Sequence, residues 1–163
     1  MSYRFYRILC PAPKELERER QVFDAAIGKF NEEVTMADGI LFAPASVAPP
    51  YSAARHRPAV EANIRICDFF VQVLDERPPD EVFRGYIGYA IQQARDSAAT
   101  MSKAAVFFRT TSGAAAEAAA YRDTLAADGG CEVLEFRDET DLAVKLRELL
   151  EKWYVPLRPQ ATR

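Results

Sequence analysis

Short hydrophobic runs alternate along the chain with longer segments in which hydrophobic residues recur every three or four positions. The short runs are nearly continuous, as in strands buried on both faces of a sheet. They predict strands at Tyr3–Cys10, Ile40–Ala43, Phe69–Leu74, Ala104–Phe108 and Cys131–Phe136. The periodic segments predict amphipathic helices at Lys14–Val34, Ala59–Ile66, Glu81–Arg95, Ala114–Ala127 and Asp138–Trp153.

Five alternations of strand and helix favour a parallel sheet with helices on both faces. Since crossovers between parallel strands are right-handed, few topologies remain, and a common strand order is 2-1-3-4-5, the flavodoxin-like winding. We therefore expect an α/β fold, a three-layer sandwich around a five-stranded parallel sheet. We expect a single domain over residues 1–155 and a flexible tail over residues 156–163.

Residues 44–58 interrupt this pattern. Four prolines in the segment oppose a regular helix or a central strand. A loop of this length inside a compact domain is usually functional or mobile. It contains Tyr51 and the only histidine of the chain, His56, which lies between two arginines.

Composition excludes several classes of protein. The chain has 163 residues, of which 49% are hydrophobic and 28% charged, as in a folded globular domain. Its net charge of −3 argues against nucleic-acid binding, which needs a basic surface. No apolar run reaches the roughly 18 residues of a membrane span, and the N-terminus does not resemble a signal peptide. We expect a cytoplasmic protein with no membrane and no nucleic-acid partner.

The three cysteines and the charged run that opens the first helix are both expected to have structural roles. The cysteines lie far apart and form no Cys-x-x-Cys pair, so a reducing compartment and small buried side chains are the interpretation we favour. The charged residues between Glu15 and Arg20 are of mixed sign. We interpret them as a solvated face that supports the helix through pairs three or four residues apart.

In the flavodoxin-like winding, ligands bind at the carboxyl ends of the strands, where strands one and three diverge. This location selects the segment around Pro13, the segment after the third strand, and the neighbouring proline-rich loop. The candidates from the last two are Tyr51, His56, Asp75, Glu76, Arg77, Asp80, Glu81 and Arg84. Location alone assigns no chemistry to these residues.

Several common motifs are missing from that location. The first strand is followed by Pro11-Ala12-Pro13 and not by the glycines or hydroxyl residues that would hold a dinucleotide, nucleotide or flavin phosphate. There is no Gly-x-Ser-x-Gly elbow, and one histidine does not support a two-histidine metal site. We therefore expect no cofactor and no metal.

Three segments resemble a bacterial domain family of unknown function, often found in front of NACHT-type and other STAND ATPases. The first contains an acidic residue, Glu15, after Pro13-Lys14, then Glu19-Arg20, and ends at Phe30-Asn31. The second, Ile64–Val71, is similar to the family's entry to strand three, Ile-x-x-Cys-Asp-x-Phe-Val. The final helix, Leu142–Trp153, also resembles the closing helix of the family.

That family looks like a relative of TIR domains and of nucleoside 2-deoxyribosyltransferases. Val73-Leu74-Asp75 and Gly88-Tyr89-Ala90 are similar to two transferase segments. The sequence departs from the transferases at the nucleophilic glutamate, because Tyr86 stands in its place. A tyrosine does not readily supply a carboxylate to an oxocarbenium-like centre. Glu81 lies about one and a half turns earlier, on another phase of the helix.

Two functions follow as alternatives. The first is a non-catalytic signalling or protein-interaction module, with a protein partner or a second copy of itself. The second is an N-glycosidase or deoxyribosyltransferase-like enzyme for a nucleoside, nucleotide or NAD. There Glu81 or Asp75 would be catalytic, and the ligand-binding residues would be Pro13, His56, Arg77, Arg84 and Tyr86. A Tyr86 that fills the cleft would favour the first function, whereas convergence of Asp75, Glu81 and an arginine on an open pocket would favour the second.

Overall fold

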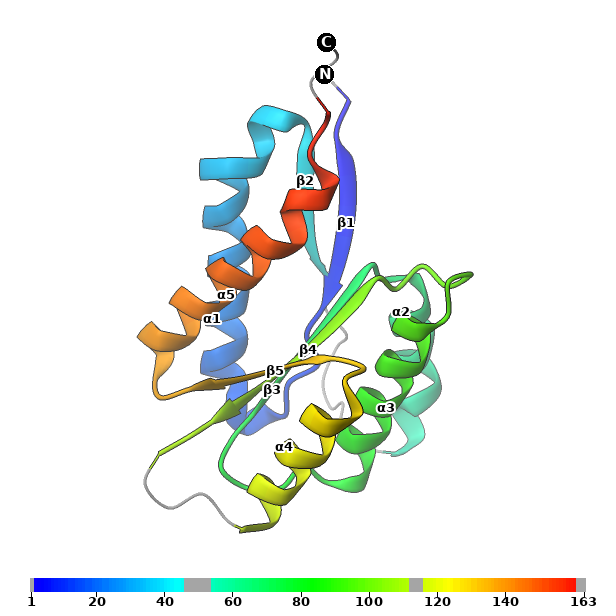
Figure 1. Cartoon of the computed structure of the whole chain (residues 1–163), viewed down its shortest axis with the longest axis vertical. Helices are drawn as coiled ribbons and strands as arrows, with labels where there is room; N and C mark the ends of the chain where they lie inside the picture. Colours follow the sequence, from blue (N-terminus) through cyan, green and yellow to red (C-terminus); the bar gives the residue numbers. More distant parts are fainter. Residues whose placement is uncertain (1, 46–53, 112–115, 161–163) are drawn as a thin grey trace.

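The computed structural model describes residues 2–45, 54–111 and 116–160, and within these ranges five parallel strands form one sheet (Figure 1). The order β2-β1-β3-β4-β5 confirms the predicted flavodoxin-like winding. The strands are β1 (Arg4–Leu9), β2 (Ile40–Ala45), β3 (Phe69–Leu74), β4 (Lys103–Arg109) and β5 (Glu132–Phe136).

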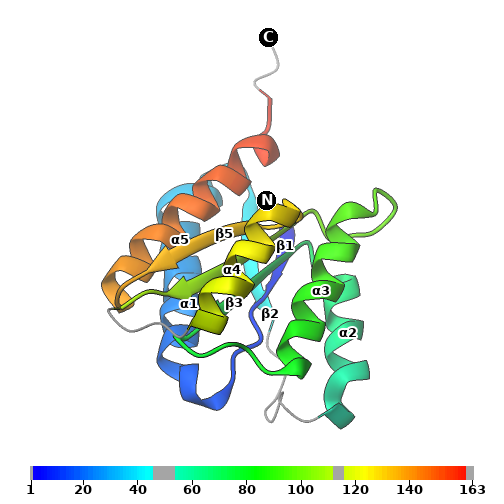
Figure 2. The same cartoon turned by 60° about the horizontal axis from the view of Figure 1, so that its bottom comes forward.

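Helices cover both faces of the sheet, as expected for a three-layer sandwich (Figure 2). Helices α1 and α5 pack on one face, and α2, α3 and α4 pack on the other. None of the helices in the described part of the chain is long and apolar enough to cross a membrane. The helices are α1 (Glu17–Phe30), α2 (Arg57–Ile66), α3 (Glu81–Arg95), α4 (Ala116–Asp128) and α5 (Glu139–Tyr154).

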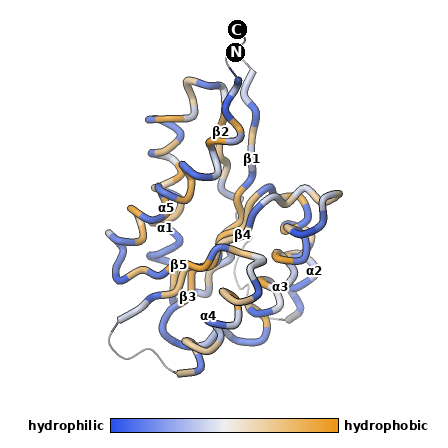
Figure 3. The backbone as a smooth tube through the Cα atoms, in the orientation of Figure 1, coloured by the Kyte–Doolittle hydropathy of each residue, from blue (hydrophilic) through white to orange (hydrophobic). Residues whose placement is uncertain are grey.

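The two faces of the sheet bury two hydrophobic cores, which follow the hydrophobic stretches of the central strands (Figure 3). The core under α1 and α5 is aromatic: Phe69 stacks on Trp153 at 4.7 Å between ring centroids, and Phe30 meets Tyr154 edge-on at 5.9 Å. All six residues of β3 are buried, because this strand is central and has helices on both faces.

The first helical segment has the predicted extent but changes its winding. A 3-10 turn, Lys14–Leu16, precedes α1, and a π-helical turn, Asn31–Thr35, follows it. The side chain of Asn31 donates to the carbonyl of Phe42 at 2.8 Å and accepts from its N–H at 2.9 Å. These bonds satisfy the backbone N–H and carbonyl of Phe42 on the outer edge of β2, and they hold the end of the helix against that strand.

Regular structure continues past residue 156, where the tail was expected to begin. Helix α5 runs into a 3-10 turn, Val155–Leu157, and Leu157 packs against the aromatic core. Arg158 lies over the ring of Tyr154 at 4.9 Å, and Arg4 donates to the carbonyl of Leu157 at 3.4 Å. Residues 161–163 lie outside the described ranges.

Strand β2 is two residues longer than predicted, and it includes Pro44. A proline is tolerated there because β2 is an edge strand and need not donate on its outer side. Residues 46–53 of the proline-rich segment, with Tyr51, lie outside the described residues. Arg57 and Pro58 begin α2, so a proline in the first helical turn is confirmed.

The cysteines are free thiols, as expected. Cys10 and Cys67 are buried, and Cys131 is half-buried. Burial raises the pKa of Cys10 to about 12 and the pKa values of Cys67 and Cys131 to about 11. Thiols this weakly acidic carry little thiolate at neutral pH, which fits a packing role.

Candidate functional site

The carboxyl ends of β1 and β3 border a small cleft, which we call the β1–β3 cleft. Its volume is about 240 Å³, at the low end for a ligand pocket. It lies where the strand order predicts a site, between the connection after β1 and the connection after β3. Its walls are formed by Pro13, Glu15, Leu16, Leu74, Asp75, Arg77, Pro78, Pro79, Asp80 and Phe83.

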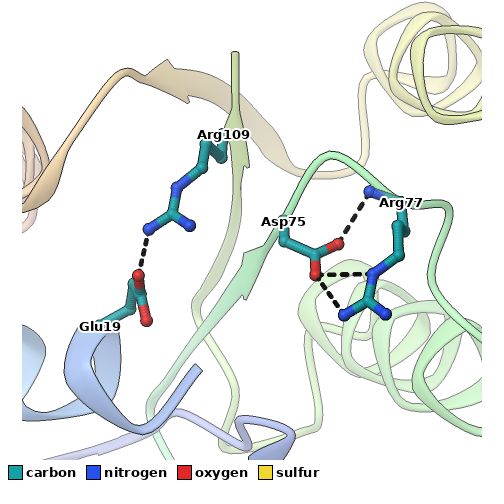
Figure 4. A network of polar contacts seen from close by, with 4 residues as sticks. All are labelled: Glu19, Asp75, Arg77 and Arg109. Carbon is teal, nitrogen blue, oxygen red and sulfur yellow. Dashed lines mark hydrogen bonds and ion pairs between the residues drawn. The ribbon is translucent and has the colours of Figure 1, made fainter. Parts of the chain in front are cut away.

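Asp75 and Arg77 form a local ion pair at the mouth of the cleft (Figure 4). The Oδ1 atom of Asp75 accepts from the backbone N–H of Arg77 at 2.8 Å. Its Oδ2 atom accepts from Nε at 3.1 Å and from Nη2 at 2.8 Å of the same arginine. Three donors of one residue therefore engage this carboxylate.

The arginine of this pair remains open to solvent. The side chain of Arg77 is 72% exposed, whereas that of Asp75 is 23% exposed. The hydrogen bond that Arg77 donates to Asp75, followed by the charge of Asp75, raises the pKa of Arg77 further. The cleft therefore offers a solvated guanidinium whose charge is largely balanced by its neighbour.

Glu81 does not share the cleft with Asp75. It is exposed in the first turn of α3 and is absent from the cleft walls described above. The N-cap of this helix is Asp80, whose Oδ1 accepts from the N–H of Phe83 at 2.9 Å. The cap fixes the phase of α3 so that Phe83, and not Glu81, faces the cleft.

Arg84 and Tyr86 lie outside the cleft as well. Arg84 donates to the carbonyl of Pro79 at 3.0 Å, and its guanidinium covers the ring of Tyr121 at 4.8 Å, toward α4. Tyr86 is fully buried in the core under α3 and meets Phe83 edge-on at 5.6 Å. Tyr86 is therefore part of the core and not of the cleft walls, because the helical period turns it inward.

Of the other two predicted ligand-binding residues, only Pro13 lines the cleft. His56 is half-buried in the 3-10 turn Ala54–His56, where its Nε2 accepts from Nε of Arg55 at 3.2 Å. It is not among the residues that form the cleft. The strand order thus brought Pro13, Asp75 and Arg77 together, but not His56, Glu81, Arg84 or Tyr86.

The sequence analysis missed a buried ion pair close to the cleft. Glu19, from the first turn of α1, is 3% exposed and accepts a hydrogen bond from Arg109 at the end of β4 (Figure 4). The prediction of a solvated charged face is wrong for Glu19, although Arg20 does pair with Glu17 at 2.6 Å. The signal was present: Glu19 follows Leu16 by three residues and precedes Phe23 by four, so it lies on the buried stripe of α1.

The burial of Glu19 is only partly compensated. Its Oε2 atom has no hydrogen-bond partner among the described residues, and Oε1 has Arg109. The guanidinium of Arg109 also lies over the ring of Phe136 at 5.4 Å. A buried carboxylate with a single partner is costly unless that partner stays in place, so the pair fixes the start of α1 to the sheet.

Arg109 also borders a second groove at the carboxyl ends of β3, β4 and β5, with a volume of about 590 Å³. Its side chains carry both signs of charge, with Glu76 and Glu139 near Arg109 and Arg137. The described ranges hold no cluster of three or more histidine, cysteine or acidic residues that could bind a metal ion. The groove is a polar surface whose lining includes three acidic residues, Glu76, Asp138 and Glu139, and two arginines.

A third concave surface lies between α1 and α5, and we call it the α1–α5 groove. It has a volume of about 480 Å³, and its floor and walls are mainly aliphatic. Its lining residues are Val22, Ala25, Ala26, Lys29, Glu139, Thr140, Ala143, Val144 and Arg147. Val144 is 53% exposed, an unusual exposure for a branched aliphatic side chain beside a groove.

Comparisons with known proteins assign this chain to no family. No protein-family model and no curated protein sequence matches the chain. A metal-soaked flavodiiron core from Synechocystis sp. is similar at a TM-score of 0.47 and 12% identity; the match covers 93% of this chain and 37% of the length of that one. A flavodoxin-like domain from Synechococcus sp. is similar at a TM-score of 0.45 and 11% identity, covering 89% and 99%. At these values the fold assignment rests on the strand order itself.

Proposed function

We propose that this chain is a non-catalytic protein-interaction module that associates with a second copy of itself through the α1–α5 groove. The observation that carries the proposal is the exposed aliphatic groove with opposite charges at its two ends. Glu139 lies at one end of the groove, and Lys29 and Arg147 lie at the other. Aliphatic centres with polar rims are typical of protein interfaces.

The placement of the charges favours a two-fold arrangement. Helices α1 and α5 each follow a strand of the same parallel sheet and pack on the same face, so they run in the same direction. A two-fold axis through the middle of the groove would place Glu139 of one copy beside Lys29 of the other, twice. Such an isologous interface needs only one self-complementary surface.

Lys29 is the cation on which this complementarity depends. Arg147 is already bonded to Glu33, whereas Lys29 approaches Glu33 at only 3.8 Å and its side chain is 70% exposed. Val144 would lie at the centre, where a partner would remove its remaining exposed surface from water. Central aliphatic contact would supply affinity, and the charges would set the orientation.

The alternative function, hydrolysis or transfer at an N-glycosidic bond, has weaker geometric support. Such chemistry needs a carboxylate free to approach the sugar ring. In the β1–β3 cleft Asp75 is engaged by Arg77, and Glu81 lies outside the cleft walls. We therefore do not propose N-glycosidase or transferase activity, and a turnover assay tests for it.

Sedimentation velocity over micromolar concentrations tests the proposed association. We expect a monomer–dimer equilibrium for the unmodified chain, weakened about tenfold or more by Val144→Asp, because a buried unpaired charge opposes association. Ile66→Asp is the matched control, since Ile66 is 52% exposed on α2, on the other face of the sheet. A chain that is monomeric throughout, or a dimer that both variants weaken equally, would contradict the proposal.

Disulfide trapping tests the orientation. A mixture of the Lys29→Cys and Glu139→Cys chains should cross-link faster than either variant alone, because the two-fold axis pairs unlike positions. The native thiols will contribute little background, because their pKa values are about 11 to 12. Equal cross-linking of each variant with itself would exclude this arrangement.

A further inference from the structure

Strand β1 extends beyond β3 at its amino-terminal end (Figure 1). It pairs with β2 along its whole length, from Arg4 to Leu9, but with β3 only at Ile8 and Leu9. On the side that faces β3, the amino-terminal half of β1 therefore has no partner strand and is a free sheet edge. Its other side is paired with β2. Such an edge is a template for another strand.

The hydrogen bonds show which backbone groups face this open side. The N–H of Arg7 donates to Oδ2 of Asp68 at 2.8 Å, and its carbonyl accepts from the N–H of Asp68 at 2.9 Å. The N–H of Arg4 donates in the opposite direction, to Gly39 at 2.9 Å, on the β2 side. Because backbone groups alternate along a strand, the N–H and the carbonyl of Phe5 face the open side. No strand among the described residues pairs with them there.

The side chains around this edge are hydrophobic and exposed. Phe5 is 62% exposed, the most exposed large hydrophobic residue in the described part of the chain. It points to the α2 side of the sheet, because Ile8 packs under α1 and α5 and side chains alternate between faces. Ile66, 52% exposed, ends α2 just before Asp68, so it lies on the same side of the sheet.

The charge near the edge is positive. Arg7 is exposed on the same face as Phe5, and Arg65 is exposed at the end of α2. Neither arginine forms an ion pair with a carboxylate of the described residues; Arg65 donates instead to the hydroxyl of Tyr89 at 3.2 Å. Asp68 is half-buried, and its Oδ2 accepts from the N–H of Arg7.

We propose that the free edge of β1 at Phe5 binds an extended acidic segment of another protein. This segment would pair with the amino-terminal half of β1 as a short added strand, on the side where β3 pairs with the carboxyl-terminal half. The backbone of Phe5 would provide one N–H and one carbonyl to the added strand, and the ring of Phe5 would cover an alternate hydrophobic side chain. Arg7 and Arg65 select acidic residues on either side of that side chain. This surface is separate from the α1–α5 groove, so the two interactions are independent.

Charge disfavours the two occupants that this chain itself could supply. Its carboxyl-terminal residues include Arg158, Pro159 and Arg163, which are basic or unable to donate. The β1 edge of a second copy would bring its own Arg4 and Arg7 against these arginines. An acidic segment from a different protein avoids both repulsions.

Selection of random linear peptides displayed on phage, with the unmodified chain as bait and Phe5→Asp for counter-selection, tests the proposal. We expect enriched peptides in which hydrophobic residues alternate with aspartate or glutamate. A labelled synthetic copy of the best peptide should bind the unmodified chain about tenfold or more tightly than Phe5→Asp in fluorescence polarisation. Phe5 is exposed, so this substitution should leave the fold intact, which circular dichroism checks.

Three controls separate strand addition from general stickiness. Met36→Asp adds the same charge at an exposed position before β2, on the other side of β1 from the free edge, and should leave peptide affinity unchanged. The double variant Arg7→Glu, Arg65→Glu should weaken the acidic peptide and favour a lysine-substituted one. N-methylation of the peptide amide opposite Phe5 should abolish binding, because it removes the strand hydrogen bond. No enrichment, no acidic preference, or equal binding to Phe5→Asp would each overturn the proposal.

Discussion

The carboxylate of Glu19 accepts a hydrogen bond from the guanidinium of Arg109, a residue ninety positions further along the chain. The pair joins the start of α1 to the end of β4 at the carboxyl edge of the sheet (Figure 4). Glu19 is nearly inaccessible, whereas the side chain of Arg109 keeps 27% of its surface exposed. The pair holds the start of α1, which directly follows the segment with Pro13 and Leu16 that lines the β1–β3 cleft.

We expect Glu19→Gln to destabilise the fold by about 2 kcal/mol, because it leaves a partly buried guanidinium without its counter-ion. Urea denaturation followed by circular dichroism measures this change. Glu17→Gln is the matched control: its carboxylate pairs with Arg20 on the surface, where solvent screens the charges, so its loss should cost far less stability. Equal effects of the two substitutions would show that the Glu19 pair adds no stability beyond a surface pair.

Glycine substitutions in two environments should have opposite effects. A Cβ added at Gly130 would lie 2.5 Å from Cγ2 of Ile91, so Gly130→Ala should lower the free energy of unfolding by about 1 to 3 kcal/mol. A Cβ added at Gly28, within α1, meets nothing within 4 Å. Gly28→Ala should therefore stabilise the chain by about 0.5 to 1 kcal/mol through helix propensity. Thermal unfolding of both variants would reveal any departure from these opposite signs.

The pH dependence of stability should identify Asp68 as a carboxyl group whose burial opposes ionisation. Burial raises its pKa above the ordinary value of 3.8. Its contribution to stability is therefore complete below that value and is lost as the pH rises through the raised pKa of the folded state. Asp68→Asn lacks this loss, so its stability relative to the unmodified chain should improve as the pH rises from acidic to neutral.

Asp141 provides the control of opposite sign. A hydrogen bond from the N–H of Arg137 is the main cause that lowers its pKa below 3.8. Its contribution is present above that value and is lost as the pH falls through the lowered pKa of the folded state. Asp141→Asn should therefore lose stability relative to the unmodified chain as the pH rises. Urea titrations at several pH values test both signs, and parallel curves for the two variants would contradict the assignment.

A mass-spectrometric screen with NAD, NADP, nucleosides and nucleotides tests whether the module is non-catalytic. We expect no released nicotinamide or nucleobase above the uncatalysed rate, even at high protein concentration. Glu81→Gln and Asp75→Asn are the diagnostic variants. Release that either substitution abolishes would assign glycosidase activity to that carboxylate and refute the non-catalytic proposal.

The strands and helices could be predicted from the sequence because each depends on the local pattern of hydrophobic residues. The bounds of β3 and α3 agree with those predicted, since a buried strand needs a continuous apolar run and a surface helix needs a hydrophobic stripe. Boundaries shifted where a contact from another element intervened. The bonds between Asn31 and Phe42 change the winding at the end of the first helix, and no local rule predicts them.

Only part of the candidate site could be predicted from the sequence. Pro13, Asp75 and Arg77 could be placed at the cleft because strand order alone decides which loops meet there. The directions of Glu81, Arg84 and Tyr86 depend on the phase of α3, which Asp80 sets by capping. The charge of Glu19 suggested a solvent-exposed position, although its helical spacing already matched the buried stripe of α1.

The sequence by itself determined the order of elements, their polarity, and therefore the winding of the sheet, because hydrophobic periodicity is a property of neighbouring residues. Tertiary structure alone decided that Arg109 neutralises Glu19 and that β1 extends past β3 to leave Phe5 on a free edge. The physical reason is the distance along the chain over which each effect acts. Periodicity acts over a few residues, whereas ion pairing, burial and strand register depend on groups that the chain brings together only when it folds.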